Sequence, residues 1–178
     1  PLLSLVTFLP LVGVVVIALI RGDAEVVARN TKNVALLTSG TTFLASLFIW
    51  FNFDPSTAAF QFEEKAAWMP SFNIAYHLGV DGISMMFVML STLLTPICVL
   101  ASWETIKDRI KEYMSAFLIL ETMMIGMFSS LDLFLFYVFF EGVLIPMFLI
   151  IGVWGGPRRV YASMKFFLFT LLGSVLML

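Results

Sequence analysis

One carboxylate lies near the middle of a long apolar run. Glu141 falls within Leu131–Gly156, LDLFLFYVFFEGVLIPMFLIIGVWGG, which is long enough to cross a bilayer as one helix, and from Leu133 to Trp154 it is the only charged side chain. A carboxylate at mid-membrane costs roughly 3 kcal/mol on insertion scales, so such residues are usually functional. A carboxyl group that gains and loses a cationic neighbour in a low-dielectric site can bind and release a proton near neutral pH. Glu141 is therefore the leading candidate for a proton relay.

Two further ionisable residues lie in neighbouring apolar runs. Glu121 is expected on the preceding helix at a depth within about 6 Å of Glu141, and Lys165 about 7 Å inside the following one, at 1.5 Å per residue. Each also has a structural interpretation. Either glutamate can be a neutral group that hydrogen-bonds neighbouring helices together, and Lys165 can extend to the membrane interface. The sequence favours a functional role for Glu141 and a weaker one for Glu121 and Lys165.

The composition is that of a membrane protein. Hydrophobic residues make up 61% and charged residues 12% of the 178 residues, with 19 Phe and 11 Met. The average soluble domain has about 25% charged residues, so we predict an all-α, polytopic transmembrane helical bundle. The net charge of −2 and the lack of a basic tract argue against nucleic acid. A single cysteine, Cys98, and a single histidine, His77, exclude a disulfide or a cysteine-ligated iron–sulfur cluster within the chain and argue against a haem or a metal site.

The hydropathy pattern predicts one transmembrane domain with about six spans. A long connection at 52–80 has period-two alternation on both sides of Met69-Pro70 and predicts a surface hairpin. Asp81 and Asp132 each precede an apolar run and are predicted helix caps. The last run is short of a full span, so we interpret the chain as an N-terminal fragment. The predicted spans are 2–20, 34–50, 83–101, 113–130, 133–154 and 160–178, the last truncated.

Basic residues alternate with these spans. They concentrate in the first, third and fifth connections, whereas the second and fourth contain only Lys65. Because Lys and Arg favour the cytoplasmic or matrix side, the N-terminus is expected outside.

Several motifs resemble one family. FFEGVLIPMFLIIGVWGG with YASMKFFLFTLLGSVLML, together with YHLGVDGIS and KEYMSAFLILETMMIGMFSSLD, is similar to the first half of the antiporter-like subunits M of respiratory complex I, NADH:quinone oxidoreductase, equivalent to mitochondrial chain 4. The resemblance covers essentially the whole chain. It implies about fourteen helices with two inverted repeats, and a fifth-helix glutamate, here Glu141, that pairs with a lysine on a later broken helix beyond Leu178. It also implies a carboxylate near the start of the fourth helix, a place that Glu104 approximately takes.

The implied function is proton translocation coupled to oxidation of NADH by quinone. The resemblance implies that this chain holds no redox centre, and that NADH, FMN, the Fe–S clusters and quinone are bound by other subunits. Its partners would be the other membrane subunits of complex I and the lipid bilayer, in a bacterial or mitochondrial inner membrane. Two alternatives remain: a multi-subunit sodium/proton antiporter subunit, and a structural subunit whose buried carboxylates are inert.

Overall fold

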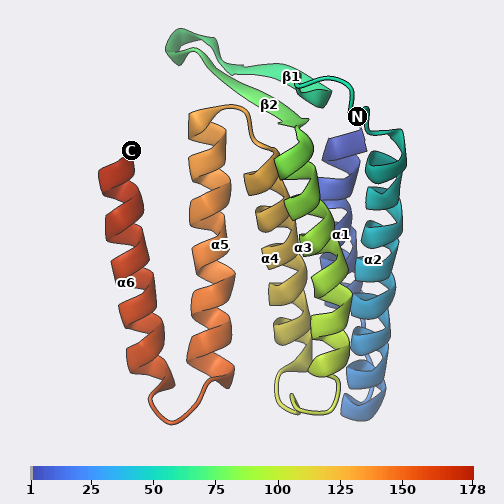
Figure 1. Cartoon of the computed structure of the whole chain (residues 1–178). Coiled ribbons are helices and arrows are strands. Elements are labelled where there is room, and N and C mark those ends of the chain that lie inside the picture. The colour runs from blue at the N-terminus through green and yellow to red at the C-terminus, as the bar shows by residue number, and fades with distance from the viewer. Residues whose placement is uncertain (1) are drawn as a thin grey trace.

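The computed structural model describes residues 2–178, which form a helical bundle with a β-hairpin across one end (Figure 1). β1 pairs with β2 antiparallel, and a short 3-10 turn at Pro70–Phe72 joins the two strands. The elements are α1 (Leu2–Leu19), α2 (Ala24–Asn52), β1 (Gln61–Met69), β2 (Ile74–Val80), α3 (Gly82–Ala101), α4 (Ile110–Ser129), α5 (Leu133–Trp154) and α6 (Arg159–Met177).

Five of the six helices formed by residues 2–178 are long and apolar enough to cross a membrane, and α4 is the exception. Lys111, Glu112 and Glu121 are spread along α4, so it lacks the long, nearly uncharged apolar stretch that the other five helices have. α4 has 20 residues and packs against α1, α2, α3 and α5, at the centre of the bundle. Glu121 is accordingly buried against protein, whereas Glu112, in the first turn of α4, is exposed.

The second helix begins ten residues before the predicted span. The connection from Arg21 to Lys32, expected to be a polar linker, is helical from Ala24 onward. Glu25 and Arg29 have the i, i+4 spacing, acid first, that stabilises an α-helix in water. The helix therefore extends past the apolar run, which marks only the part suited to lipid.

The hairpin is fixed to the bundle at two places. Ser4 on α1 donates from its backbone N–H (2.9 Å) and its hydroxyl (2.5 Å) to the carboxylate of Glu64 on β1. At the other place the Leu131 N–H donates to the His77 carbonyl at 2.8 Å, and the Ala75 N–H donates to Asp132 at 3.1 Å. His77, within the predicted surface hairpin, is half-buried in β2 because this strand packs on the link between α4 and α5.

Both predicted caps are confirmed. The Asp81 carboxylate accepts from the N–H groups of Ile83 and Ser84, and the Asp132 carboxylate from those of Phe134 and Leu135. These N–H groups hold the pKa of Asp81 below its usual value. The Ala75 N–H, together with those of the first turn of α5, does the same for the pKa of Asp132. Each carboxylate thereby satisfies donors at a helix end that have no partner within the helix.

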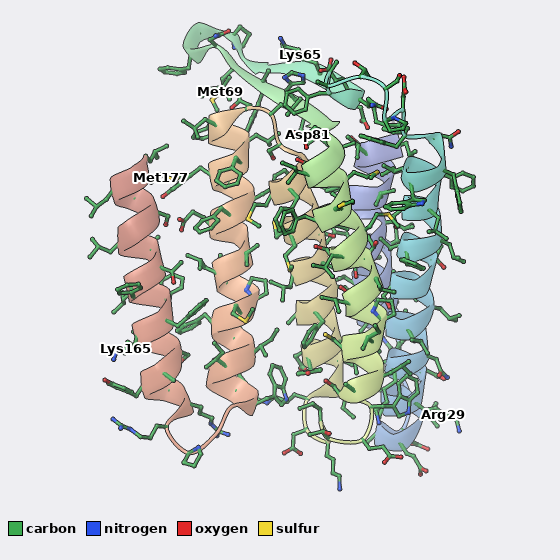
Figure 2. The ribbon with its side chains drawn as sticks, viewed as in Figure 1. Arg29, Lys65, Met69, Asp81, Lys165 and Met177 are labelled. Carbon is green, nitrogen blue, oxygen red and sulfur yellow. The ribbon has the colours of Figure 1, made fainter. Side chains whose placement is uncertain are left out.

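The two ends of the bundle differ in charge. The hairpin and the start of α1 lie at one end, and the α1–α2, α3–α4 and α5–α6 connections lie at the other (Figure 1). Lys65 marks the hairpin end and Arg29 the opposite end (Figure 2). Most basic residues gather at this opposite end, here called the basic end: Arg21, Arg29, Lys32, Lys107, Arg109, Lys111, Arg158 and Arg159.

The interior of the bundle consists of two apolar clusters with a polar layer between them. One cluster, near the hairpin, contains Leu3, Ile49 and Ile125, and the other, near the basic end, contains Ile17 and Leu118. Between the clusters, α1, α2, α3 and α4 each bury polar side chains, alongside a few apolar ones such as Leu120. This mid-bundle polar layer comprises Thr7, Ser39, Thr42, Ser46, Ser91, Thr92, Thr95, Glu121 and Thr122.

Candidate functional site

Glu141 lies nine residues into α5, about 12 Å from the start of this helix at 1.5 Å per residue. The side chain is half-buried and accepts a hydrogen bond on Oε1 from the hydroxyl of Ser174 on α6. The same hydroxyl has the carbonyl oxygens of Thr170 and Leu171 at 2.9 and 3.1 Å as alternative acceptors. Because one hydroxyl carries one proton, Ser174 can turn toward Glu141 or back to its own helix.

A cavity of about 330 Å³ adjoins this pair between α5 and α6. Its lining is mainly apolar and includes Phe136, Phe140 and Phe169, and its polar side chains are Thr170 and Ser174. Glu141 does not line this space itself but is hydrogen-bonded to Ser174 at its polar edge, and a hydroxyl group or a water molecule there can exchange a proton with the carboxyl group.

Glu121 lies in a different environment. It is 1% exposed, and neither carboxylate oxygen has a hydrogen-bond partner among residues 2–178. It lines a cavity of about 410 Å³ together with residues of α3, including Ser91 and Thr95, and with Met147 of α5. An ionised carboxylate without a partner is costly to bury, so this group needs a proton, water or a counter-charge.

The packing of α4 on α5 places the two glutamates at nearly the same depth. Gly126 of α4 faces the ring of Phe139, and Gly142 of α5 faces the Sδ of Met123. In both contacts the two residue numbers add to 265, which defines how the residues of α4 and α5 are aligned. In this register Glu141 is level with residue 124, three residues or about 4.5 Å from Glu121. The structure does not bring the carboxylates together, however, because Glu141 contacts α6 whereas Glu121 lines the cavity against α3.

Lys165 and Glu104 lie away from both sites. Lys165 is exposed on α6, with its Nζ 5.7 Å from the centroid of the Tyr161 ring, and points away from α5 (Figure 2). Glu104 is exposed in the α3–α4 connection, six residues before α4 begins at Ile110. The carboxylate in the first turn of α4 is instead Glu112.

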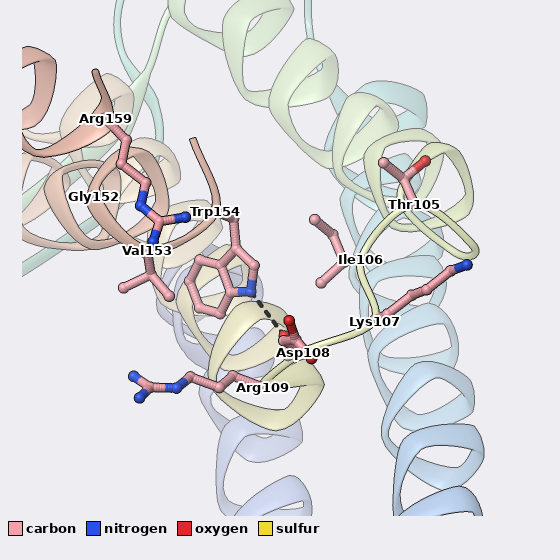
Figure 3. Close-up of a pocket in the computed structure, with 9 residues that line it drawn as sticks. All are labelled: Thr105, Ile106, Lys107, Asp108, Arg109, Gly152, Val153, Trp154 and Arg159. Atoms are coloured by element: carbon pink, nitrogen blue, oxygen red, sulfur yellow. Dashed lines mark hydrogen bonds between the residues drawn. The ribbon is translucent and has the colours of Figure 1, made fainter. Parts of the chain in front are cut away.

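A surface pocket of about 560 Å³ lies at the basic end, between the α3–α4 and α5–α6 connections (Figure 3). The Trp154 indole N–H donates to the Asp108 carbonyl at 2.8 Å and joins the two connections. Lys107, Arg109 and Arg159 give this pocket its charge, and none of the predicted site residues lines it. Within residues 2–178 no group of three His, Cys, Asp or Glu side chains could hold a metal ion.

Sequence reasoning missed the hydroxyl groups around the two glutamates. Ser174 and Thr95 are common residue types in transmembrane helices, and nothing in their local sequence distinguishes them from other Ser and Thr. The spacing of Thr170 and Ser174, which places both on one face of α6, is the only signal that could have indicated a polar edge there.

The sequence matches two protein families. Residues 5–130, more than two thirds of the chain, match the family described as NADH-ubiquinone oxidoreductase chain 4, amino terminus. Residues 130–178 match the family described as NADH:quinone oxidoreductase/Mrp antiporter, TM.

Similar curated proteins come from bacteria and from eukaryotes. NADH-quinone oxidoreductase subunit M of Rhodobacter capsulatus is 54% identical over 99% of this chain and 34% of its own length. NADH-ubiquinone oxidoreductase chain 4 of Chondrus crispus is 49% identical over 99% of this chain and 35% of its own. The chain thus spans about a third of the length of these relatives.

The fold is also found in solved structures. A chain of respiratory complex I from Thermus thermophilus matches with a TM-score of 0.79 and 29% identity, over 97% of this chain and 33% of that one. A chain of an archaeal membrane-bound sulfane sulfur reductase matches at 19% identity with a TM-score of 0.77, over 99% of this chain and 26% of that one, which shows the fold alone. The apolar helices and these relatives identify an integral membrane protein. From the match over most of its length, the chain belongs to the NADH-ubiquinone oxidoreductase chain 4 family.

Proposed function

We propose that this chain is the first part of a membrane subunit that translocates protons in NADH:quinone oxidoreductase, and that Glu141 binds and releases a transported proton. The observation that carries the proposal is the position of Glu141 on α5, half-buried at mid-helix and hydrogen-bonded to Ser174 of α6. Ionisable side chains at this depth of a transmembrane helix are rare and commonly belong to proton pathways.

The contact with α6 supports a relay through α5 and α6. Ser174 can donate to the ionised Glu141, or turn to the Thr170 carbonyl while a protonated Glu141 donates to the serine oxygen. Glu141 therefore has a hydrogen-bond partner in both protonation states, so loss of the proton leaves no polar atom of this pair unpaired. An approaching cation from a later part of the protein would then favour the ionised state.

Proton pumping driven by NADH in membrane vesicles tests this role. In the full-length protein within its complex, Glu141→Gln removes the titrating group and keeps the side-chain volume. We expect pumping to fall at least about 100-fold, the lower range for loss of a positioned acid–base group. Glu25→Gln, an exposed change in the first turn of α2, serves as the matched control and should pump at the wild-type rate.

The amount of assembled complex is measured on native gels, so that loss of pumping can be separated from loss of the protein. Pumping at the wild-type rate in an assembled Glu141→Gln complex would reject the relay and favour the structural subunit. Pumping that requires sodium would favour the antiporter alternative, which the match to chain 4 does not favour.

The same proposal covers partners, cofactors and orientation. The other membrane subunits of the complex and the lipid bilayer are the expected neighbours of the apolar side chains exposed on α6, such as Phe169 and Leu176. NADH, FMN, the Fe–S clusters and quinone are expected on other subunits. The concentration of Lys and Arg at the basic end supports an N-terminus on the outer side of a bacterial or mitochondrial inner membrane.

A further inference from the structure

The mid-bundle polar layer contains more polar atoms than it can pair internally. Ser46 and Thr92 hydrogen-bond to one another at 2.9 Å across α2 and α3. By contrast, Thr7 Oγ1, Thr122 Oγ1 and both oxygens of Glu121 are buried without a partner among residues 2–178. Buried polar groups in folded proteins are nearly always paired with protein atoms or ordered water, so the layer calls for bound water.

One hydroxyl group beside Glu121 can serve either protonation state. Thr95 lies beside the Glu121 carboxyl, and its hydroxyl donates to the Ser91 carbonyl at 2.9 Å. In this orientation the Thr95 oxygen can accept a hydrogen bond from a protonated Glu121. Like the hydroxyl of Ser174, the Thr95 hydroxyl can also turn away from its own helix and donate to an ionised Glu121.

The surface of the cavity beside Glu121 is almost entirely apolar, and apart from Glu121 its few polar side chains lie on one helix. The polar lining comes from α3, where Ser91, Thr95 and Cys98 follow at intervals of four and three residues and so lie on one face. Ser102 continues that face one turn nearer the basic end, where its hydroxyl is 2.6 Å from the Tyr113 hydroxyl. The other lining residues are mainly apolar: Phe87, Leu90, Leu94, Phe117, Leu120, Met124, Phe128 and Met147.

We propose that Glu121 is a second proton-binding site, separate from Glu141, which water reaches through the cavity along the Ser91, Thr95 and Cys98 face of α3. Hydronium in the cavity transfers a proton to one carboxylate oxygen and becomes water, and release reverses the transfer. The inference deepens the proposed function by adding a site of the same chemistry on a different helix interface.

Charged groups near Glu121 are few. The titratable residue that α3 contributes to the cavity lining is Cys98. The α5 residue in the lining is the uncharged Met147, since Glu141 contacts α6 instead. α1 carries no charged residue within Leu2–Leu19, and the charges of α2 lie in its first nine residues, at the basic end. Because no cation within residues 2–178 pairs with Glu121, water and a bound proton are what remain to satisfy it.

Infrared spectroscopy of the full-length protein in its lipid-reconstituted complex tests the site without using pumping. The difference spectrum between wild type and Glu121→Gln at pH 7 should contain the carbonyl band of a protonated carboxylic acid. This band should shift on transfer to D2O and persist in Glu141→Gln. Thr95→Val should slow the shift at least about tenfold, since positioned proton-transfer groups contribute 10²–10⁴-fold. Thr122→Val is the control, because Thr122 is as deeply buried but does not line the cavity.

A second measurement leaves Glu121 unchanged. Cys98, the single cysteine of this sequence, should react with a charged, water-soluble thiol reagent, with Cys98→Ser as the blank. Absence of the carboxylic acid band, a band that does not shift in D2O, or an unreactive Cys98 would each overturn the proposal. None of these results depends on whether Glu141→Gln still pumps, so this site and the Glu141 relay can fail separately.

Discussion

Asp132, in the link between α4 and α5, accepts hydrogen bonds from the first turn of α5 and from β2. Substitutions of Asp132 should separate the contributions of these bonds to local stability. Its Oδ1 accepts from the N–H groups of Phe134 and Leu135 at 2.9 and 3.2 Å, which caps α5. Its Oδ2 accepts from the Ala75 N–H of β2 at 3.1 Å, which ties the hairpin to the link between α4 and α5. Asp132→Ala removes both acceptor oxygens and with them all three hydrogen bonds. Asp132→Asn keeps a carbonyl oxygen for the cap, but its NH2 group would then face the Ala75 N–H, donor against donor.

The expected magnitudes follow from these bonds. Loss of an N-cap costs about 1 kcal/mol, which opens the first turn of α5 roughly fivefold more often. A hydrogen bond to a charged acceptor contributes about 1.5–3 kcal/mol, and the lower value suits a half-exposed carboxylate, giving about tenfold faster opening at Ala75. Asp132→Ala should therefore speed hydrogen exchange at Ala75, Phe134 and Leu135, and Asp132→Asn at Ala75 alone.

Hydrogen exchange resolved to single amides in the full-length protein measures these rates. The sign of the pH dependence provides an independent check. The pKa of Asp132 is lowered by the Ala75 N–H first and then by the N–H groups of the cap, so its contribution is complete above the unfolded pKa of about 3.9. Protection of Ala75, corrected for intrinsic rates, should stay constant from pH 7 to about 4 and fall below that as the carboxylate protonates. If Ala75 exchanges as slowly in Asp132→Asn as in wild type, the carboxylate does not hold the hairpin.

Two further predictions concern packing and orientation. Gly126→Ala would place a Cβ 2.4 Å from the Phe139 ring and should destabilise the full-length protein by about 1–3 kcal/mol in thermal unfolding, whereas Gly40→Ala meets no atom within 4 Å and should not. Equal melting temperatures for the two variants would contradict this close contact. Cysteine substituted for Lys65 should react with an impermeant reagent added outside intact cells or mitoplasts, and cysteine substituted for Lys107 only after the membrane is opened; the opposite pattern would reverse the orientation.

The membrane-embedded helices could be predicted from hydropathy because lipid demands an unbroken apolar run. The ends of the helices could not, since hydropathy reports where a helix meets lipid and not where its hydrogen bonds end. This is why α2 begins at Ala24, well before its apolar run. The hairpin could be anticipated from its period-two alternation, and the caps from the position of Asp81 and Asp132. The place where the hairpin docks depended on long-range contacts such as Ala75 with Asp132, which leave no local pattern.

The directions in which the two glutamates point show how far sequence reasoning can go at the candidate site. Depth follows from counting residues, and Glu121 and Glu141 are indeed nearly level. The direction in which each glutamate points depends on how its helix is rotated about its axis. Gly126 and Gly142 indicate that rotation, because small residues mark where transmembrane helices approach closely. At 100° per residue, Glu141 lies roughly 130° around α5 from the face that contacts α4 through Phe139 and Gly142. Glu121 lies roughly 170° around α4 from its own contact face, which includes Gly126. Two carboxylates that point away from a shared interface cannot exchange a proton directly, so under the two proposals each has its own proton partner, on α6 for Glu141 and in the cavity against α3 for Glu121.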